Sequence, residues 1–131
     1  MLRRHLVVLA VTTAAVLASA GSALAEQRPF TQPAFAAAQA AGRPILIDIH
    51  APWCPVCRAQ EPIIESLAAQ PANQELLVLR VDFDRQKDVV RSFRATSQST
   101  LIAYRGTRET ARSVGDTTPA GVARVVNSTQ R

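Results

Sequence analysis

The chain has 131 residues, of which 47% are hydrophobic and 19% charged, and its formal net charge is +5. This length accommodates one compact domain with a real core and excludes two. The basic excess does not predict nucleic-acid binding, because the arginines at 91–112 are interspersed with Asp88, Glu109 and Asp116 and come without stacked aromatics.

The N-terminal segment has the pattern of a secretory signal peptide. Residues 3–5 are basic, residues 6–18 are apolar, and residues 23–25 form an Ala-x-Ala cleavage pattern. The apolar stretch is shorter than the roughly 20 residues that span a bilayer. We therefore predict that residues 1–25 are removed and that residues 26–131 form the mature domain.

The first predicted element of the mature chain is a helix. We expect residues 26–30 to be a loose lead-in without regular structure. The alanine-rich segment 33–41 predicts a helix that begins near Thr31 or Gln32 and stops at Gly42.

An apolar strand and a longer helix are expected next. Residues 45–50 are apolar on both faces of the predicted strand, which indicates a central, at least partly parallel strand covered by helices on each side. The following helix is expected at 55–69 and ends before Pro71. Pro55 fits its first position, whereas Pro62 falls in its interior and should kink it.

The second half of the chain repeats this alternation and then adds a hairpin. We predict a strand at 76–83, a helix at 85–93, a hairpin of strands at 100–104 and 109–114, and a helix at 120–128 that starts with Thr118-Pro119. The order of elements predicts an α/β sandwich with a mixed sheet of about four strands flanked by helices.

Cys54 and Cys57 are the only cysteines of the chain, and they directly follow the first apolar strand in the sequence Trp-Cys-Pro-Val-Cys. A strand that enters a helix through a Cys-x-x-Cys turn places the first sulfur at the helix N-terminus, where free N–H groups and the helix dipole favour a thiolate. The second sulfur lies one turn further on and faces the first. Such a pair can open and close as a disulfide with little backbone movement, and its loop is too short to contribute much stability. The pattern predicts thiol–disulfide exchange.

Residues 43–128 resemble the thioredoxin family in more than the cysteine pair. The family carries an acidic residue six positions before the first cysteine, a Trp directly before it and a Pro five positions after the second cysteine. It also carries a basic residue in the next strand and a Gly near the end of the last strand. The matching residues here are Asp48, Trp53, Pro62, Arg80 and Gly115. The resemblance, which extends to exported and membrane-linked disulfide reductases, implies a three-layer thioredoxin-like sandwich.

The sequence departs from the family at the loop opposite the cysteines. The family places a cis-proline before a Thr there, whereas this chain has Ser99 before Thr100. A cis bond before a residue other than proline costs roughly 3 kcal/mol, so we expect the bond from Gln98 to Ser99 to be trans or strained. The resemblance implies that Gln98, Ser99 and Thr100 contact the substrate. Ser99 either adds a hydroxyl to the active-site face or fills a turn, and both interpretations stay open.

The cysteines and the acidic strand residue have predicted chemical roles. Cys54, expected to be the exposed member, is the attacking thiolate, and the more buried Cys57 resolves the mixed disulfide. Burial should raise the pKa of Asp48 and make it a proton acceptor for Cys57. An ion pair between Asp48 and Arg80 is the structural alternative, and the two roles can coexist.

The remaining candidate residues would tune the cysteine pair. His50 lies on the same predicted strand face as Asp48, and as an imidazolium it would stabilise the thiolate; alternatively it is a polar strand end. Trp53 is a lid over the sulfurs or a packing residue. Pro55 and Val56 set how well the helix N–H groups reach Cys54.

These expectations together describe an exported thiol–disulfide oxidoreductase, periplasmic or secreted, without a cofactor. Its partners would be cysteine-containing exported proteins and a membrane electron-transfer protein that recharges it. We expect a soluble monomer that works as a reductase rather than an oxidase. The alternative is a metal-binding or metal-delivery module in which Cys54, Cys57 and His50 hold copper or zinc, although a tetrahedral zinc site needs a fourth ligand.

Overall fold

The structure is a computed structural model, and it describes residues 24–131. The predicted signal peptide, residues 1–25, therefore lies almost entirely outside the described residues. Within residues 24–131, no helix combines the length and the apolar character that crossing a bilayer requires.

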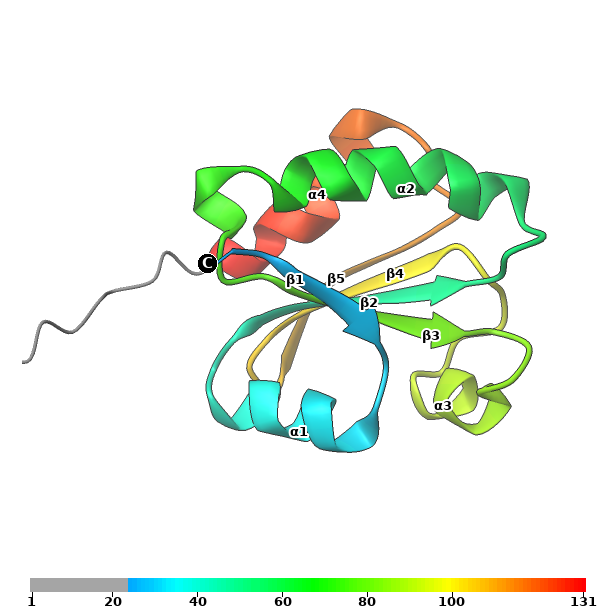
Figure 1. The fold of residues 1–131 in the computed structure, drawn as a ribbon, viewed down its shortest axis with the longest axis horizontal. Coiled ribbons are helices and arrows are strands. Elements are labelled where there is room, and N and C mark those ends of the chain that lie inside the picture. The colour runs from blue at the N-terminus through cyan, green and yellow to red at the C-terminus, as the bar shows by residue number, and fades with distance from the viewer. Residues whose placement is uncertain (1–23) are drawn as a thin grey trace, which may run out of the picture.

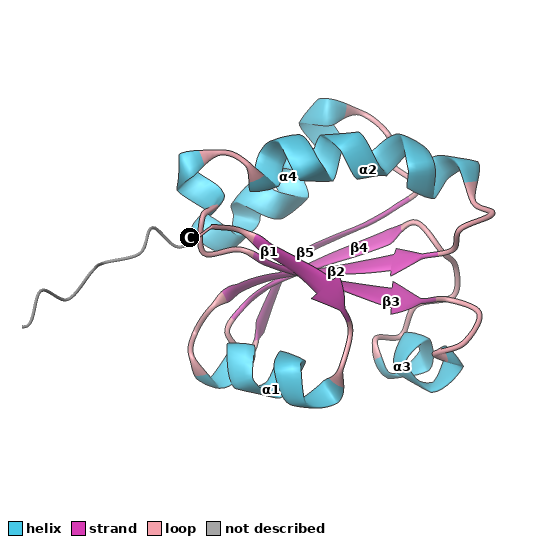
Figure 2. Ribbon diagram, viewed as in Figure 1, coloured by secondary structure: helices cyan, strands magenta, loops and turns pink. Residues whose placement is uncertain are grey.

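A five-stranded mixed sheet forms the centre of the domain (Figure 2), one strand more than the sequence predicts. Its spatial order is β1-β3-β2-β4-β5, in which β2 pairs in parallel with β3 and antiparallel with β4. The strands are β1 (Glu26–Pro29), β2 (Pro44–His50), β3 (Leu77–Asp82), β4 (Thr100–Arg105) and β5 (Arg108–Val114). The predicted central position of the strand at 45–50 is confirmed.

Helices cover both faces of this sheet, and the predicted three-layer sandwich is confirmed (Figure 1). Helices α2 and α4 lie on one face, and α1 and α3 lie on the other. The helices are α1 (Gln32–Ala40), α2 (Pro55–Ala68), α3 (Lys87–Ser92) and α4 (Pro119–Asn127), with short 3-10 turns at Pro71–Asn73 and Ser128–Gln130.

Strand β1 corrects the sequence analysis, which expected a loose lead-in at 26–30. It runs parallel to β3 at the sheet edge, where the N–H of Glu26 donates to the carbonyl of Leu76 at 3.0 Å and that of Phe30 to the carbonyl of Arg80 at 2.8 Å. Its side chains are mostly exposed, so no apolar alternation marks it. Pro29 is tolerated because an edge strand needs only half of its backbone donors.

The helix boundaries follow from side-chain caps. Thr31 and Thr118 cap α1 and α4 by accepting backbone N–H bonds from Ala34 and Gly121, as their sequence positions predict. Helix α3 is shorter than the predicted 85–93. The residues expected to begin this helix belong to a preceding loop instead. In that loop the carboxylate of Asp82 accepts the backbone N–H groups of Asp84 and Arg85.

The two faces of the sheet have separate cores. On the α1 and α3 face, β2 contributes Ile45, Ile47 and Ile49, which pack with Phe30, Phe35, Phe93 and strand residues of β3 and β4. On the α2 and α4 face it contributes Leu46, which packs with Ile64, Leu67, Val122, Val125 and Val126. Because side chains alternate along a strand, Asp48 and His50 lie on this second face.

Candidate active site

The cysteine pair occupies the N-terminus of α2, as the sequence predicts. Cys54 is the N-cap of the helix, and its Sγ accepts the backbone N–H of Cys57 at 3.1 Å. Both side chains are buried, with 1% of Cys54 and 2% of Cys57 exposed, and they pack against Ala51 and Phe83. The expectation that Cys54 is the exposed member is therefore wrong, because the loop containing Ser99 also covers its sulfur.

The two thiols differ in acidity. Burial alone would raise the pKa of Cys54, but its hydrogen bonds with Cys57, with Ser99 and with the backbone N–H groups of the first helical turn lower that pKa below the ordinary value. Burial raises the pKa of Cys57, and its hydrogen bond with Cys54 raises it further. The asymmetry favours Cys54 over Cys57 as the sulfur that ionises first.

Ser99 lies against both sulfurs. Its Oγ is 3.1 Å from Cys54 Sγ and 3.3 Å from Cys57 Sγ, and the residue is only 3% exposed. The structure contains no cis peptide bond among residues 24–131, and Ser99 has a φ of 64°, in the left-handed region. The bond from Gln98 to Ser99 is therefore trans, which is one of the two outcomes expected for it, and the positive φ of Ser99 is an additional feature that was not predicted.

Gln60 is a buried residue of this site that the sequence analysis missed. Its amide Nε2 donates to the carbonyl of Ser99 at 3.3 Å and to that of Asp116 at 2.9 Å. It therefore ties α2 to the loop before β4 and to the segment after β5. The sequence pattern that could have identified Gln60 is the helical spacing of the residues that α2 buries: Cys57, Gln60, Ile64 and Leu67.

Asp48 is buried within an ion-pair network. Arg80 Nε lies 3.1 Å from Asp48 Oδ2, and Arg80 Nη1 lies 3.0 Å from Glu61 Oε1. Burial raises the pKa of Asp48, and the pairing with Arg80 offsets only part of that rise. The expected ion pair with Arg80 is present, and the net change in the pKa of Asp48, for which burial and the ion pair act in opposite directions, is a rise. Glu61, which lies one helical turn after Cys57, was not predicted as a site residue.

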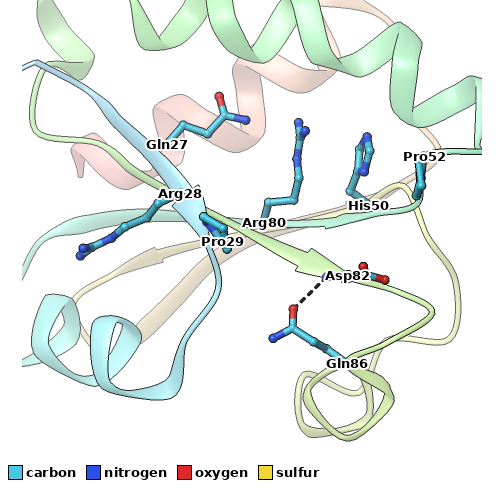
Figure 3. A pocket seen from close by; sticks show the side chains of 8 residues that line it. All are labelled: Gln27, Arg28, Pro29, His50, Pro52, Arg80, Asp82 and Gln86. Carbon is cyan, nitrogen blue, oxygen red and sulfur yellow. Dashed lines mark hydrogen bonds between the residues drawn. The ribbon is translucent and has the colours of Figure 1, made fainter.

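His50 lines a pocket of about 400 Å³ beside this network. Figure 3 shows the side chains of His50 and Arg80 pointing to the same side of the sheet, towards α2. The other lining residues come from β1 and from the end of β3 and the turn after it: Gln27, Arg28, Pro29, Asp82 and Gln86, with Pro52 at the rim. His50 is thus placed beside the Asp48 network, on the face predicted for it.

The residues flanking the cysteines lie at the surface. Trp53 is 55% exposed, and its indole N–H donates to Asp84 Oδ2 at 2.7 Å. Asp84 was not predicted as a site residue. Pro55 occupies the first position of α2, and Val56 beside it is exposed. An exposed Trp and Val next to buried sulfurs give the site an apolar rim.

The other two residues predicted to contact the substrate, Gln98 and Thr100, differ in exposure. Gln98 is partly exposed. Thr100 is buried, and its hydroxyl donates to the carbonyl of Ser97 at 2.7 Å, which closes the turn. Gly115 also fixes this loop: it has a φ of 71°, and its N–H donates to the carbonyl of Ser99 at 3.0 Å.

A metal site finds little support in the arrangement of side chains. Across residues 24–131, no three His, Cys, Asp or Glu side chains gather closely enough to ligate an ion. His50 therefore does not complete a ligand set with Cys54 and Cys57, as the alternative interpretation requires.

Comparison with known proteins agrees with the geometry. The family model described as Thioredoxin matches residues 27–128. The bifunctional thioredoxin reductase/thioredoxin of Mycobacterium leprae is 33% identical over 81 residues, which is 62% of this chain and 18% of that protein. The thioredoxin of Mycobacterium bovis is 33% identical over 73 residues, which is 56% of this chain and 62% of that protein. The chain thus spans less than two thirds of the length of these relatives.

Among solved structures, Trxlp from Edwardsiella tarda EIB202 is 45% identical and superposes with a TM-score of 0.73, covering 78% of this chain and 97% of that chain. The family match, in contrast to the shorter matches with single relatives, extends from β1 to the end of α4. The chain belongs to the thioredoxin family.

Proposed function

We propose that this protein is a thiol–disulfide oxidoreductase that exchanges the Cys54–Cys57 dithiol or disulfide with cysteines of other proteins. The observation that carries the proposal is the placement of two sulfurs at one helix N-terminus, where Cys54 caps α2 and its Sγ accepts the N–H of Cys57 at 3.1 Å. This arrangement lowers the pKa of Cys54, while burial raises that of Cys57. A nucleophilic thiolate beside a protonated reserve thiol is what two successive exchange steps require.

In the first step, Cys54 attacks one sulfur of a substrate disulfide. A new bond forms between Cys54 Sγ and that sulfur, the substrate S–S bond breaks, and the leaving thiolate takes a proton from solvent. The exposed Trp53 and Val56 beside the site offer an apolar surface for the segment that carries the substrate disulfide.

In the second step, Cys57 loses its proton and attacks Cys54 Sγ. The Cys54–Cys57 disulfide forms, and the second substrate thiolate leaves, so two electrons pass from the pair to the substrate. Asp48 is the proposed proton acceptor, because its raised pKa brings it closer to that of a thiol. A dithiol donor then has to reduce the pair again.

We also propose the direction of electron transfer and the cellular location of the protein. Asp48 as acceptor for the Cys57 proton assists the resolving step, in which the pair reduces its substrate, and this supports the reductase direction. The signal-peptide pattern of residues 1–25 supports export, with cysteine-containing exported proteins as substrates and a membrane electron-transfer protein as donor.

The test is a trapping experiment with single-cysteine variants. The Cys57→Ser protein should accumulate a mixed disulfide with an oxidised substrate protein such as insulin, visible as a thiol-sensitive band on a non-reducing gel. The matched Cys54→Ser protein should form no such band, and both should lose insulin reduction with dithiothreitol. Equal trapping by the two variants, or insulin reduction retained in Cys54→Ser, would contradict the proposal.

A further inference from the structure

Ser99 combines a backbone that disfavours it with a side chain in contact with both sulfurs. Its φ of 64° is a conformation that glycine adopts freely and that costs other residues about 1–3 kcal/mol. Three hydrogen bonds hold the residue there: its N–H donates to Ile49, and its carbonyl accepts from Gly115 and Gln60. If Ser99 only formed a turn, glycine would fit better, because it adopts this φ without strain. The presence of serine therefore directs attention to its hydroxyl.

The hydroxyl lies between the two reacting atoms. Its oxygen is 3.1 Å from Cys54 Sγ and 3.3 Å from Cys57 Sγ, within hydrogen-bond reach of each sulfur. A serine O–H rotates about its Cβ–Oγ bond, so one hydrogen can serve either sulfur without movement of a heavy atom. With 3% of Ser99 exposed, water competes little for this donor.

We propose that the Ser99 hydroxyl is a catalytic donor that hydrogen-bonds first the Cys54 thiolate and then the Cys57 thiolate as exchange proceeds. The inference rests on the proposed thiol–disulfide exchange. In the reduced protein the O–H points to Cys54 Sγ, the negatively charged atom. Once Cys54 is bonded to the substrate sulfur and is neutral, the O–H turns to Cys57 Sγ as the latter loses its proton to Asp48. The hydroxyl itself gains and loses no proton.

Hydrogen bonding from this site to both sulfurs also favours the thiolate form of each: contact with Ser99 lowers the pKa of Cys54 and opposes the rise in that of Cys57. Stabilising a thiolate stabilises the reduced protein, which shifts the couple towards a higher reduction potential. A proline at this position has no donor of this kind. Ser99 would therefore make the protein a milder reductant than the same fold with a proline.

The first measurement is the rate of Cys54 alkylation by iodoacetamide at pH 6 in Ser99→Ala and Ser99→Gly proteins. Both variants lose the hydroxyl, but only glycine also relieves the backbone strain. We expect both rates to fall about tenfold, the effect of one hydrogen bond to a charged group. Ser97→Ala, two residues earlier in the same loop, should react like the wild type.

The second measurement addresses the resolving step. After mixing with oxidised glutathione and quenching with acid, both Ser99 variants should accumulate the Cys54–glutathione mixed disulfide, whereas the wild type should not. Their equilibrium with glutathione should shift about tenfold towards the oxidised pair, equivalent to about 30 mV. Circular dichroism and thermal melting establish that each variant is folded.

The outcomes separate this inference from the proposed function. Alkylation rates within twofold of the wild type in both folded variants would overturn the role of Ser99, while Cys57→Ser trapping would still support exchange. A loss in Ser99→Ala that Ser99→Gly does not share would also overturn it, because the backbone and not the hydroxyl would then be responsible. Trapping by neither cysteine variant would remove the proposed function itself.

Discussion

The two faces of the sheet differ in what they bury. The α1 and α3 face holds an aromatic cluster in which Phe35 contacts Phe30, Phe93 and Tyr104 at ring-centroid distances of 5.7, 5.3 and 5.4 Å. The α2 and α4 face buries Asp48 and Gln60 among aliphatic residues, and it carries the cysteines at one end of α2.

This difference indicates a division of tasks within one domain. Aromatic pairs and aliphatic burial stabilise the fold on the first face without any buried charge. On the second face, burial of a carboxylate costs stability and at the same time raises its pKa. Substitutions on the first face should change stability alone, and those on the second should change stability and thiol chemistry together.

The largest expected effect is on the aromatic face. Phe35→Ala should lower the free energy of unfolding by about 3–5 kcal/mol, because it removes a buried ring and leaves a cavity. Urea unfolding followed by circular dichroism measures this loss. In the folded fraction, the alkylation rate of Cys54 should stay within twofold of the wild type. A tenfold change in that rate would show that the two faces are coupled.

Gln60→Ala should affect both properties. Loss of its hydrogen bonds to the carbonyls of Ser99 and Asp116 should cost about 2 kcal/mol of unfolding free energy. The loosened Ser99 loop should also slow Cys54 alkylation, measured at pH 6. The exposed Gln74→Ala is the matched control and should change neither value. An unaltered alkylation rate in Gln60→Ala would mean that Ser99 is held without this amide.

Asp48→Asn should raise stability and lower activity. Because the folded-state pKa of Asp48 lies above its unfolded value, the wild type loses stability as the pH rises through that interval, and the carboxylate is a net cost at neutral pH. Removing the charge should therefore raise the free energy of unfolding at pH 7 and have no such effect at a pH where Asp48 is protonated, while Arg80 keeps its ion pair with Glu61.

The same variant should slow insulin reduction about tenfold or more, through loss of the proton acceptor for Cys57. Asp88→Asn, at an exposed helix position, is the control for removal of a negative charge. A destabilised Asp48→Asn protein with full activity would assign Asp48 to the ion pair with Arg80 alone.

The smallest effect is expected at the rim of the site. Trp53→Phe keeps an aromatic ring but removes the exposed hydrogen bond to Asp84, which should cost about 0.5 kcal/mol or less. Asp84→Ala should have an equal effect in thermal melting. If Trp53→Phe raises Cys54 alkylation tenfold while Asp84→Ala does not, the indole shields the sulfur as a lid.

The sequence was most informative where a residue type has one strong preference. Threonine caps, Gly42 at the end of α1 and the apolar run of β2 predicted these elements correctly. The position of Asp48 in a buried strand predicted its ion pair with Arg80. The Cys-x-x-Cys spacing predicted the helix N-terminus that favours one thiolate.

Features that depend on tertiary contact could not be predicted in the same way. Strand β1 has exposed side chains and exists through backbone pairing with β3, which leaves no hydrophobic pattern. The burial of Cys54 depends on a loop 45 residues later in the chain, which brings Ser99 against it. Glu61 joins the Asp48 network only through its ion pair with Arg80, which links α2 to β3.

The most direct test of the proposed reductase is the reduction potential of the Cys54–Cys57 couple, measured by equilibrating the protein in glutathione or dithiothreitol buffers and following Trp53 fluorescence. We expect a single two-electron transition nearer to about −270 mV, the value of thioredoxin, than to about −120 mV, the value of a strong disulfide donor. A potential near −120 mV would contradict the reductase assignment, and the absence of a two-electron transition would contradict the exchange function.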